Sequence, residues 1–217
     1  MASSWRVVLV EPANPLNIGF VARAMRASGI RDLAVVSRSF TAIPAEAHVT
    51  GVSAPDILSG ARVVADLASA LRGCASAVAF SRRPSALKQD EFTLPDRPAL
   101  GGRTALVFGR ESSGLTREET AQCRYLARIP NQNGVSLNLG QAVAVGLFAL
   151  TAKGAARRTE EKAASMDRLS ALWEFVEPRL AKSTPARRRR VRQLFFQMHL
   201  DDPGASLLFS IMKELSK

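Results

Sequence analysis

Short apolar runs alternate with segments of helical period over residues 1–152, and this alternation is the strongest constraint on the fold. After the first run, "RVVLV", apolar residues recur at spacings of three and four, which predicts a helix. We expect Asn17 to cap this helix and Gly29 to end it. Such alternation is typical of an α/β fold with a mostly parallel sheet covered by helices. Strands are predicted at 6–10, 33–36, 76–80, 104–108 and 125–129.

The composition changes in the last third of the chain. Residues 153–164 are small and charged, which predicts a linker or a helix extension. Residues 165–217 show only helical patterns, with Thr184 expected to cap a helix that begins at Pro185. We therefore predict an α/β domain over 1–152 and a small all-helical extension over 165–217.

The charge balance favours an anionic partner. The formal net charge is +11, and residues 151–217 carry 14 Lys or Arg against 8 Asp or Glu, which is over half of that excess. A basic surface of this kind most often binds nucleic acid, so RNA or DNA is the expected partner.

Several other classes of protein are disfavoured. Two cysteines, Cys74 and Cys123, and two histidines, His48 and His199, support neither a disulfide framework nor a zinc site. The first apolar run is too short for the core of a signal peptide, and no segment reaches the roughly 18 apolar residues that a membrane span needs. We expect a cytoplasmic protein with no metal and no membrane partner.

Three loops follow predicted strands, at the sheet edge where ligands bind in open α/β folds. The first, "EPANPLNIGFVARAMR" at 11–26, contains Asn17 and Arg23. In one interpretation Asn17 only caps the helix and Arg23 is only solvated. In the other, the free amides of the helix start and Arg23 bind phosphate.

The second loop is "FGRESSGLTREE" at 108–119. Gly109 and Gly114 have the glycine spacing of a P-loop, but Leu115 stands where that motif requires Lys, and the chain has no dinucleotide fingerprint. Thr116 with Glu119 forms a capping box. Local structure leaves Glu111 unexplained, so this carboxylate is a candidate ligand or hydrogen-bond acceptor.

The third loop, "NQNGVSLN" at 131–138, places amides and a hydroxyl directly before a helix that is expected to be fully buried. Gly134 allows backbone conformations that other residues avoid. Ser136 and Asn138 serve either as ordinary caps of that helix or as ligand contacts.

Taken together and in this order, the loops resemble the three motifs of the SpoU/TrmH family of SPOUT methyltransferases. The matching stretches are "NxGxxAR" at 17–23, "FGxExxGL" at 108–115 and "SLNLGQAV" at 136–143. The resemblance implies an α/β domain with a deep C-terminal trefoil knot, an exception to the rule that chains are unknotted. It also implies a homodimer that binds S-adenosyl-L-methionine in the knot and methylates the ribose 2′-hydroxyl of RNA.

The resemblance also assigns site residues. It implies that Arg23 activates the 2′-hydroxyl, in some members as a general base. Because a guanidinium is always charged and is a poor base, we instead expect Arg23 to clamp a substrate phosphate and stabilise the developing alkoxide, with phosphate or water taking the proton. Asn17, Glu111, Ser136 and Asn138 would orient Arg23, the ribose and the cofactor. Cofactor contacts are implied at Phe80, Ser81, Arg82, Gly109, Ile129, Ser136, Leu137 and Asn138.

The order of the domains most resembles the TrmJ subgroup, which modifies nucleotide 32 of the tRNA anticodon loop. An rRNA substrate or another tRNA position is the alternative within the family. From another class, the alternative is a non-catalytic RNA-binding protein on the same scaffold.

The extension holds an arginine cluster of its own. Five arginines within six residues exceed what solubility needs, and phosphate contacts favour such an arrangement, although a solvated helix face would look similar. Trp173 and Phe175 either stack on bases or pack the helices. The predicted RNA contacts in the extension are Arg187, Arg188, Arg189, Arg190 and Arg192.

Overall fold

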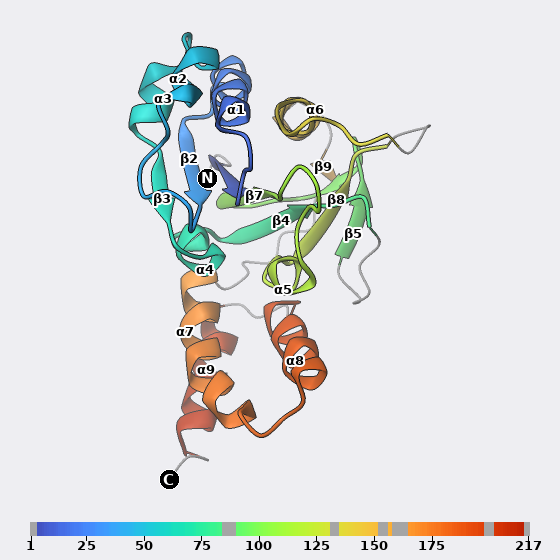
Figure 1. Cartoon of the computed structure of the whole chain (residues 1–217). Coiled ribbons are helices and arrows are strands. Elements are labelled where there is room, and N and C mark those ends of the chain that lie inside the picture. Colours follow the sequence, from blue (N-terminus) through green and yellow to red (C-terminus); the bar gives the residue numbers. More distant parts are fainter. Residues whose placement is uncertain are drawn as a thin grey trace.

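The protein, seen in a computed structural model that describes residues 4–83, 90–130, 135–151, 156–157, 165–197 and 202–214, is built on a seven-stranded sheet (Figure 1). The strand order is β3-β2-β1-β7-β4-β8-β5, and every pairing in the sheet is parallel. The strands are β1 (Ser4–Val10), β2 (Asp32–Val36), β3 (Arg62–Val64), β4 (Ser76–Phe80), β5 (Asp90–Thr93), β7 (Arg103–Phe108) and β8 (Tyr125–Arg128). The prediction of a parallel α/β sheet is confirmed.

The central strands are buried on both faces, which explains their uninterrupted apolar runs. All five predicted strands are present with small shifts at their ends. The edge strands β3 and β5 escaped prediction because β3 has only three residues and β5 is largely polar. A second sheet pairs β6 (Arg97–Pro98) with β9 (Ala156–Arg157).

One face of the sheet is covered by α1 (Pro15–Ala27), α2 (Glu46–Thr50), α3 (Pro55–Ser59) and α6 (Leu139–Thr151), as Figure 1 shows. Because side chains alternate along a strand, Val7 and Leu9 of β1 point into this layer. They share a core with Ile18 and Met25 of α1 and Leu147 of α6.

The opposite face is covered largely by the C-terminal extension. The helices there that belong to the α/β domain, α4 (Leu67–Leu71) and α5 (Arg117–Thr120), are only five and four residues long. Val8 and Val10 of β1 share a second core with Leu169, Trp173 and Phe195 of the extension. The extension is helical, as predicted, and its side chains complete the core on this face of the sheet. Its helices are α7 (Met166–Val176), the 3-10 helix η1 (Glu177–Leu180), α8 (Pro185–Gln197) and α9 (Asp202–Glu214).

Backbone contacts fix the start of α7 against the α/β domain. The N–H of Met166 donates to the carbonyl of Cys74 at 2.7 Å, and the N–H of Gly73 donates to both carboxylate oxygens of Asp167 at 2.8 Å. None of the helices in the described residues has both the length and the apolar content to cross a bilayer.

Two predictions about helices are wrong. The first helix begins at Pro15 and is capped by Asn14, whose side chain accepts from the N–H of Leu16, so Asn17 lies inside the helix and not at its cap. The helix α6 is not fully buried, because Val145 and Phe148 are exposed. A period of 3.6 residues leaves one stripe of α6 facing away from the sheet.

The glycine in "NxGxxAR" is explained by packing between helices. A Cβ at Gly19 would lie 2.2 Å from both the carbonyl oxygen of Ala47 and the hydroxyl of Thr50, and 2.7 Å from the N of Gly51. Backbone atoms cannot yield as a flexible side chain does, so only glycine lets α1 and α2 approach this closely.

Gly19→Ala should therefore destabilise the protein by about 1–3 kcal/mol or more, because α2 must shift to admit the methyl group. Urea denaturation followed by circular dichroism measures the change. The matched control is Gly101→Ala, where a Cβ would meet nothing within 4 Å. Equal stability of the two variants would contradict this account of the motif.

Candidate active site

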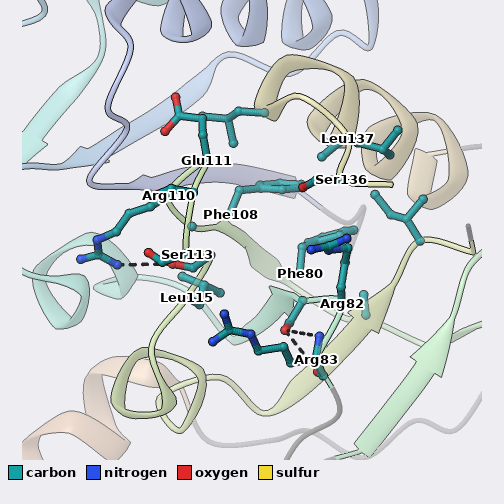
Figure 2. Close-up of a pocket in the computed structure, with 18 of the residues that line it drawn as sticks. Phe80, Arg82, Arg83, Phe108, Arg110, Glu111, Ser113, Leu115, Ser136 and Leu137 are labelled. Atoms are coloured by element: carbon teal, nitrogen blue, oxygen red, sulfur yellow. Dashed lines mark hydrogen bonds between the residues drawn. The ribbon is translucent and has the colours of Figure 1, made fainter. Parts of the chain in front are cut away.

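The strands β1, β7, β4 and β8 are neighbours, and the loops at their carboxyl ends meet at one edge of the sheet. A cavity opens there, as a parallel α/β sheet leads one to expect (Figure 2). Its lining residues are Phe80, Ser81, Arg82, Arg83, Phe108, Gly109, Arg110, Glu111, Ser112, Ser113, Gly114, Leu115, Ala127, Ile129, Val135, Ser136, Leu137, Leu139 and Ala142.

Most of the residues assigned to cofactor binding line this cavity. They are Phe80, Ser81, Arg82, Gly109, Ile129, Ser136 and Leu137. Asn138 does not line it, although it follows Leu137 directly. Glu111, assigned to catalysis, is also in the lining. The cavity thus draws together residues from three separate loops.

One wall of the cavity is aromatic. The rings of Phe80 and Phe108 stack with centroids 4.2 Å apart and an interplanar angle of 16°. Both rings are largely buried, and Gly146 of α6 leaves room for them, since a Cβ there would lie 2.9 Å from Phe80. Ile129 and Leu137 extend this apolar surface, so it suits a flat, weakly polar group.

Asn17 ties together the three motif segments at 17–23, 108–115 and 136–143. Its amide nitrogen donates to Oε1 of Glu111 at 2.7 Å, and its amide oxygen accepts from Nδ2 of Asn138 at 3.0 Å. The Oδ1 of Asn138 in turn accepts from the N–H of Gly140 at 2.8 Å. Asn17 is 4% exposed, so its amide is held in one orientation by partners on two other loops.

Glu111 completes this network at the start of α1. Its second oxygen accepts from the N–H of Ala13 at 2.9 Å, and Oε1 also accepts from the N–H of Asn14 at 3.3 Å. Burial acts to raise the pKa of Glu111, but the hydrogen bonds from Ala13, Asn17 and Asn14 outweigh it and lower the pKa below its ordinary value. The carboxylate is therefore charged at neutral pH.

The loop that carries Glu111 is closed by Arg110. Its guanidinium forms two hydrogen bonds to the carboxylate of Glu119, both at 3.0 Å. The hydrogen bond from Glu119 raises the pKa of Arg110, which stays charged. Gly109 packs onto the backbone of Gly114. A Cβ at Gly109 would lie 2.3 Å from the carbonyl carbon of Gly114. Sequence reasoning missed Arg110, although it lies within the second motif.

Arg23 lies outside the cavity. It is exposed on α1, the helix that also exposes Phe20. Figure 1 shows α1 and α6 covering the same face of the sheet, and α6 exposes Val145 and Phe148. Arg23 is therefore an exposed residue of the helix that carries Phe20, and it does not line the cavity.

The predicted arginine cluster separates into two groups in the structure. Arg187, Arg188 and Arg190 are exposed on α8. Arg189 bonds Oε1 of Glu118 on α5 at 2.9 Å, and Arg192 lies 5.6 Å from the centre of the Trp173 ring.

Packing accounts for the second group. Trp173 is buried against Phe195, so it packs the helices and offers no face to a base. Burial lowers the pKa of Arg192, as expected for a cation held between helices.

The donor set of the cavity suits an organic ligand of mixed polarity. The aromatic wall fits a planar ring, while the hydroxyls of Ser81 and Ser136 and the guanidinium of Arg83 fit hydroxyl and carboxylate groups. Among the described residues, no three His, Cys, Asp or Glu side chains are grouped to hold a metal ion.

Known proteins resemble this chain in both sequence and structure. The SpoU rRNA Methylase family matches residues 4–148. The tRNA (cytidine/uridine/adenosine-2′-O-)-methyltransferase TrmJ of Pseudomonas aeruginosa is 40% identical over 149 residues, covering 64% of this chain and 57% of that protein. LasT of Escherichia coli, an uncharacterized tRNA/rRNA methyltransferase, is 35% identical over 177 residues, or 77% of each protein.

A solved structure extends the likeness to the C-terminal helices. The crystal structure of TrmJ from Z. mobilis superposes with a TM-score of 0.85 at 26% identity, and the match covers 98% of this chain and 99% of that one. The chain thus spans just over half of the Pseudomonas protein and nearly all of the Z. mobilis chain.

Glu111→Gln should lower the stability of the fold, by an amount that depends on pH. The lowered pKa of Glu111 means that the carboxylate stabilises the fold above its ordinary pKa of about 4.3, and that this stabilisation is lost as pH falls through the lower folded value. The melting temperature of the variant should therefore lie below that of the wild type at pH 7, and the difference should shrink in acid.

Melting curves from pH 3 to 8 measure this difference. Glu46→Gln, at an exposed position of α2, is the matched control. A Glu111→Gln deficit that stays constant across the range would contradict the role of the charged carboxylate.

Proposed function

Because the chain belongs to the SpoU rRNA Methylase family, we propose that it is an S-adenosyl-L-methionine-dependent tRNA 2′-O-methyltransferase. The observation that carries the proposal is the hydrogen-bond network of Glu111, Asn17 and Asn138, which joins the three motif segments beside the cavity. The Pseudomonas relative is named a tRNA 2′-O-methyltransferase, and the Z. mobilis structure carries the same protein name, TrmJ. In this proposal the target is cytidine or uridine at nucleotide 32 of the anticodon loop.

S-Adenosyl-L-methionine fits the donor set of the cavity. We propose that Phe80, Ile129 and Leu137 surround the adenine ring of the cofactor. Ser136 and Arg83 would hold the hydroxyl and carboxylate groups of the cofactor. AviRb, a SpoU methyltransferase of Streptomyces viridochromogenes, has been solved with this cofactor, and it shares the fold at a TM-score of 0.56. When bound, the cofactor supplies a methyl group activated by a sulfonium.

The residues of the chain supply orientation and charge. Glu111 and Asn17 fix the loops that frame the cavity, so that the cofactor and a ribose hydroxyl are held at attack distance. Such positioning is worth roughly 7–11 kcal/mol of the barrier when it is complete.

Arg23 is proposed to act on the substrate side of the reaction. A guanidinium with a pKa above about 12 does not take a proton from a hydroxyl at neutral pH. It can hold the adjacent phosphate and stabilise the alkoxide as the proton leaves to phosphate or water.

A homodimer would explain where Arg23 works. Phe20, Val145 and Phe148 form an exposed apolar face on α1 and α6, and we propose that a second copy covers it. Arg23 extends from the same helix, so the dimer would bring it to RNA bound at the cavity of the partner. The trefoil knot also belongs to this proposal, and it rests on the resemblance of the three motif segments to those of the family.

The exposed arginines Arg187, Arg188 and Arg190 are proposed to contact RNA phosphates in the cytoplasm. An rRNA substrate is the alternative within the family. A scaffold without catalysis is disfavoured because the buried amide of Asn17 keeps partners on both other loops.

Nucleoside mass spectrometry tests the reaction directly. Unmodified tRNA incubated with the protein and S-adenosyl-L-methionine should gain a 2′-O-methylnucleoside, and fragment mapping should place it at nucleotide 32. Arg23→Ala should lower kcat by about 10²–10³-fold, as loss of a transition-state donor does, and Arg23→Lys should lose at least about tenfold.

The control for that assay is Arg26→Ala on the same helix, whose side chain pairs with Asp56. Its kcat should stay within about twofold of the wild type. No methylated product from tRNA or rRNA would overturn the proposed function.

Phe148→Asp tests the dimer. Phe148 is 76% exposed in the single chain, so a charge there should leave the fold intact while preventing the apolar face from being buried. Light scattering after size exclusion should report a monomer for this variant and a dimer for the wild type. Val49→Asp, at a 70% exposed position on α2, should remain dimeric.

A further inference from the structure

Two consecutive glutamates of α5 hold different parts of the molecule. Glu119 bonds the arginine of the cavity loop, and Glu118 bonds an arginine of the C-terminal extension. In Figure 1, α5 lies between the sheet and the end of α8. This four-residue helix is therefore a bridge between the cavity and the extension.

On the cavity side, Glu119 fixes the loop 109–115. Beyond its two bonds to Arg110, it accepts from the N–H of Thr116 at 2.8 Å and completes the capping box of α5. Arg110 and Leu115 both line the cavity, so the position of α5 sets the position of part of the cavity wall. A displacement of α5 would be felt where the cofactor is proposed to bind.

On the extension side, Glu118 accepts from Nη1 of Arg189 at 2.9 Å. The side chains are 55% and 33% exposed, so the pair lies at the rim of the contact. Behind it, Leu115 shares the second core with Phe195 of α8 and Trp173 of α7. The helix α8 thus shares a core with the chain segment that closes the cavity loop, and the Arg189–Glu118 pair joins it to α5.

Arg189 differs from its neighbours in this respect. Arg187 and Arg188 are exposed, whereas Arg189 points to α5 and Arg190 donates to Gln193 of its own helix at 3.1 Å. The helix α8 therefore carries exposed arginines that are available to RNA. In the same turns it carries Arg189, which contacts α5, the helix that holds the cavity loop.

We propose that Arg189 and Glu118 are positioning residues that brace the loop 109–115 from α8, so that RNA binding to α8 and cofactor binding in the cavity are coupled. The proposal rests on the proposed function, since it concerns the same cofactor and RNA. It also assigns Arg189 a role other than phosphate contact. Because coupling between two binding events is reciprocal, cofactor should strengthen RNA binding by the same factor by which RNA strengthens cofactor binding.

Calorimetric titration of S-adenosyl-L-methionine, with and without unmodified tRNA, tests the coupling in the full-length protein. Arg189→Gln and Glu118→Gln should each raise the cofactor Kd about two- to fivefold without RNA, as expected for loss of a partly exposed ion pair. The charge swap Arg189→Glu with Glu118→Arg should restore much of the affinity. Arg188→Gln is the matched control, and it should weaken RNA binding while leaving the cofactor Kd unchanged.

The two glutamine variants separate positioning from simple electrostatics. If the residues acted only through attraction to RNA, Arg189→Gln would weaken tRNA binding, Glu118→Gln would strengthen it, and neither would change the cofactor Kd. That result would overturn the coupling and leave the proposed function intact. Absence of any cofactor binding by the wild type would instead overturn the proposed function, and the coupling with it.

Discussion

The hydrogen-bond chain from Glu111 through Asn17 to Asn138 joins segments that are 94 and 121 residues apart in the sequence. Each side chain in this series is hydrogen-bonded to the next. The series ends at backbone N–H groups at the starts of α1 and α6. Because a buried amide without partners costs free energy, each of the three segments stabilises the other two. Of its members only Glu111 lines the cavity, so the network acts from beside the cavity and holds the loop 109–115 against the starts of α1 and α6.

The sheet places this network and also explains the C-terminal extension. Parallel strands carry all their ligand-facing loops at one edge, and they must be covered on both faces. The helices α4 and α5 are too short to cover the second face, so α7 and α8 provide much of its core. The C-terminal extension is therefore not a separately tethered domain, because it shares a core with the sheet that carries the cavity loops.

The arginines show how tertiary structure divides a set of similar side chains. Arg110 closes the cavity loop, Arg192 packs on Trp173, and Arg189 contacts α5. Arg23 and Arg188 are exposed. A guanidinium suits all these places because it is always charged, forms paired hydrogen bonds to a carboxylate and stacks on aromatic rings. The presence of an arginine at a position therefore does not by itself reveal its role.

The sequence by itself determined the five central strands, the capping box of Thr116 and Glu119, and the segments 109–115 and 135–137 that line the cavity. These features depend on spacings of a few residues, within which periodicity and capping act. Only the tertiary structure decided that Asn17 bonds Glu111 and Asn138, that Arg110 closes the cavity loop, and that Arg189 meets Glu118. The physical reason is that a polar side chain takes the partners that packing brings within about 3 Å, and most of these partners are distant in the chain.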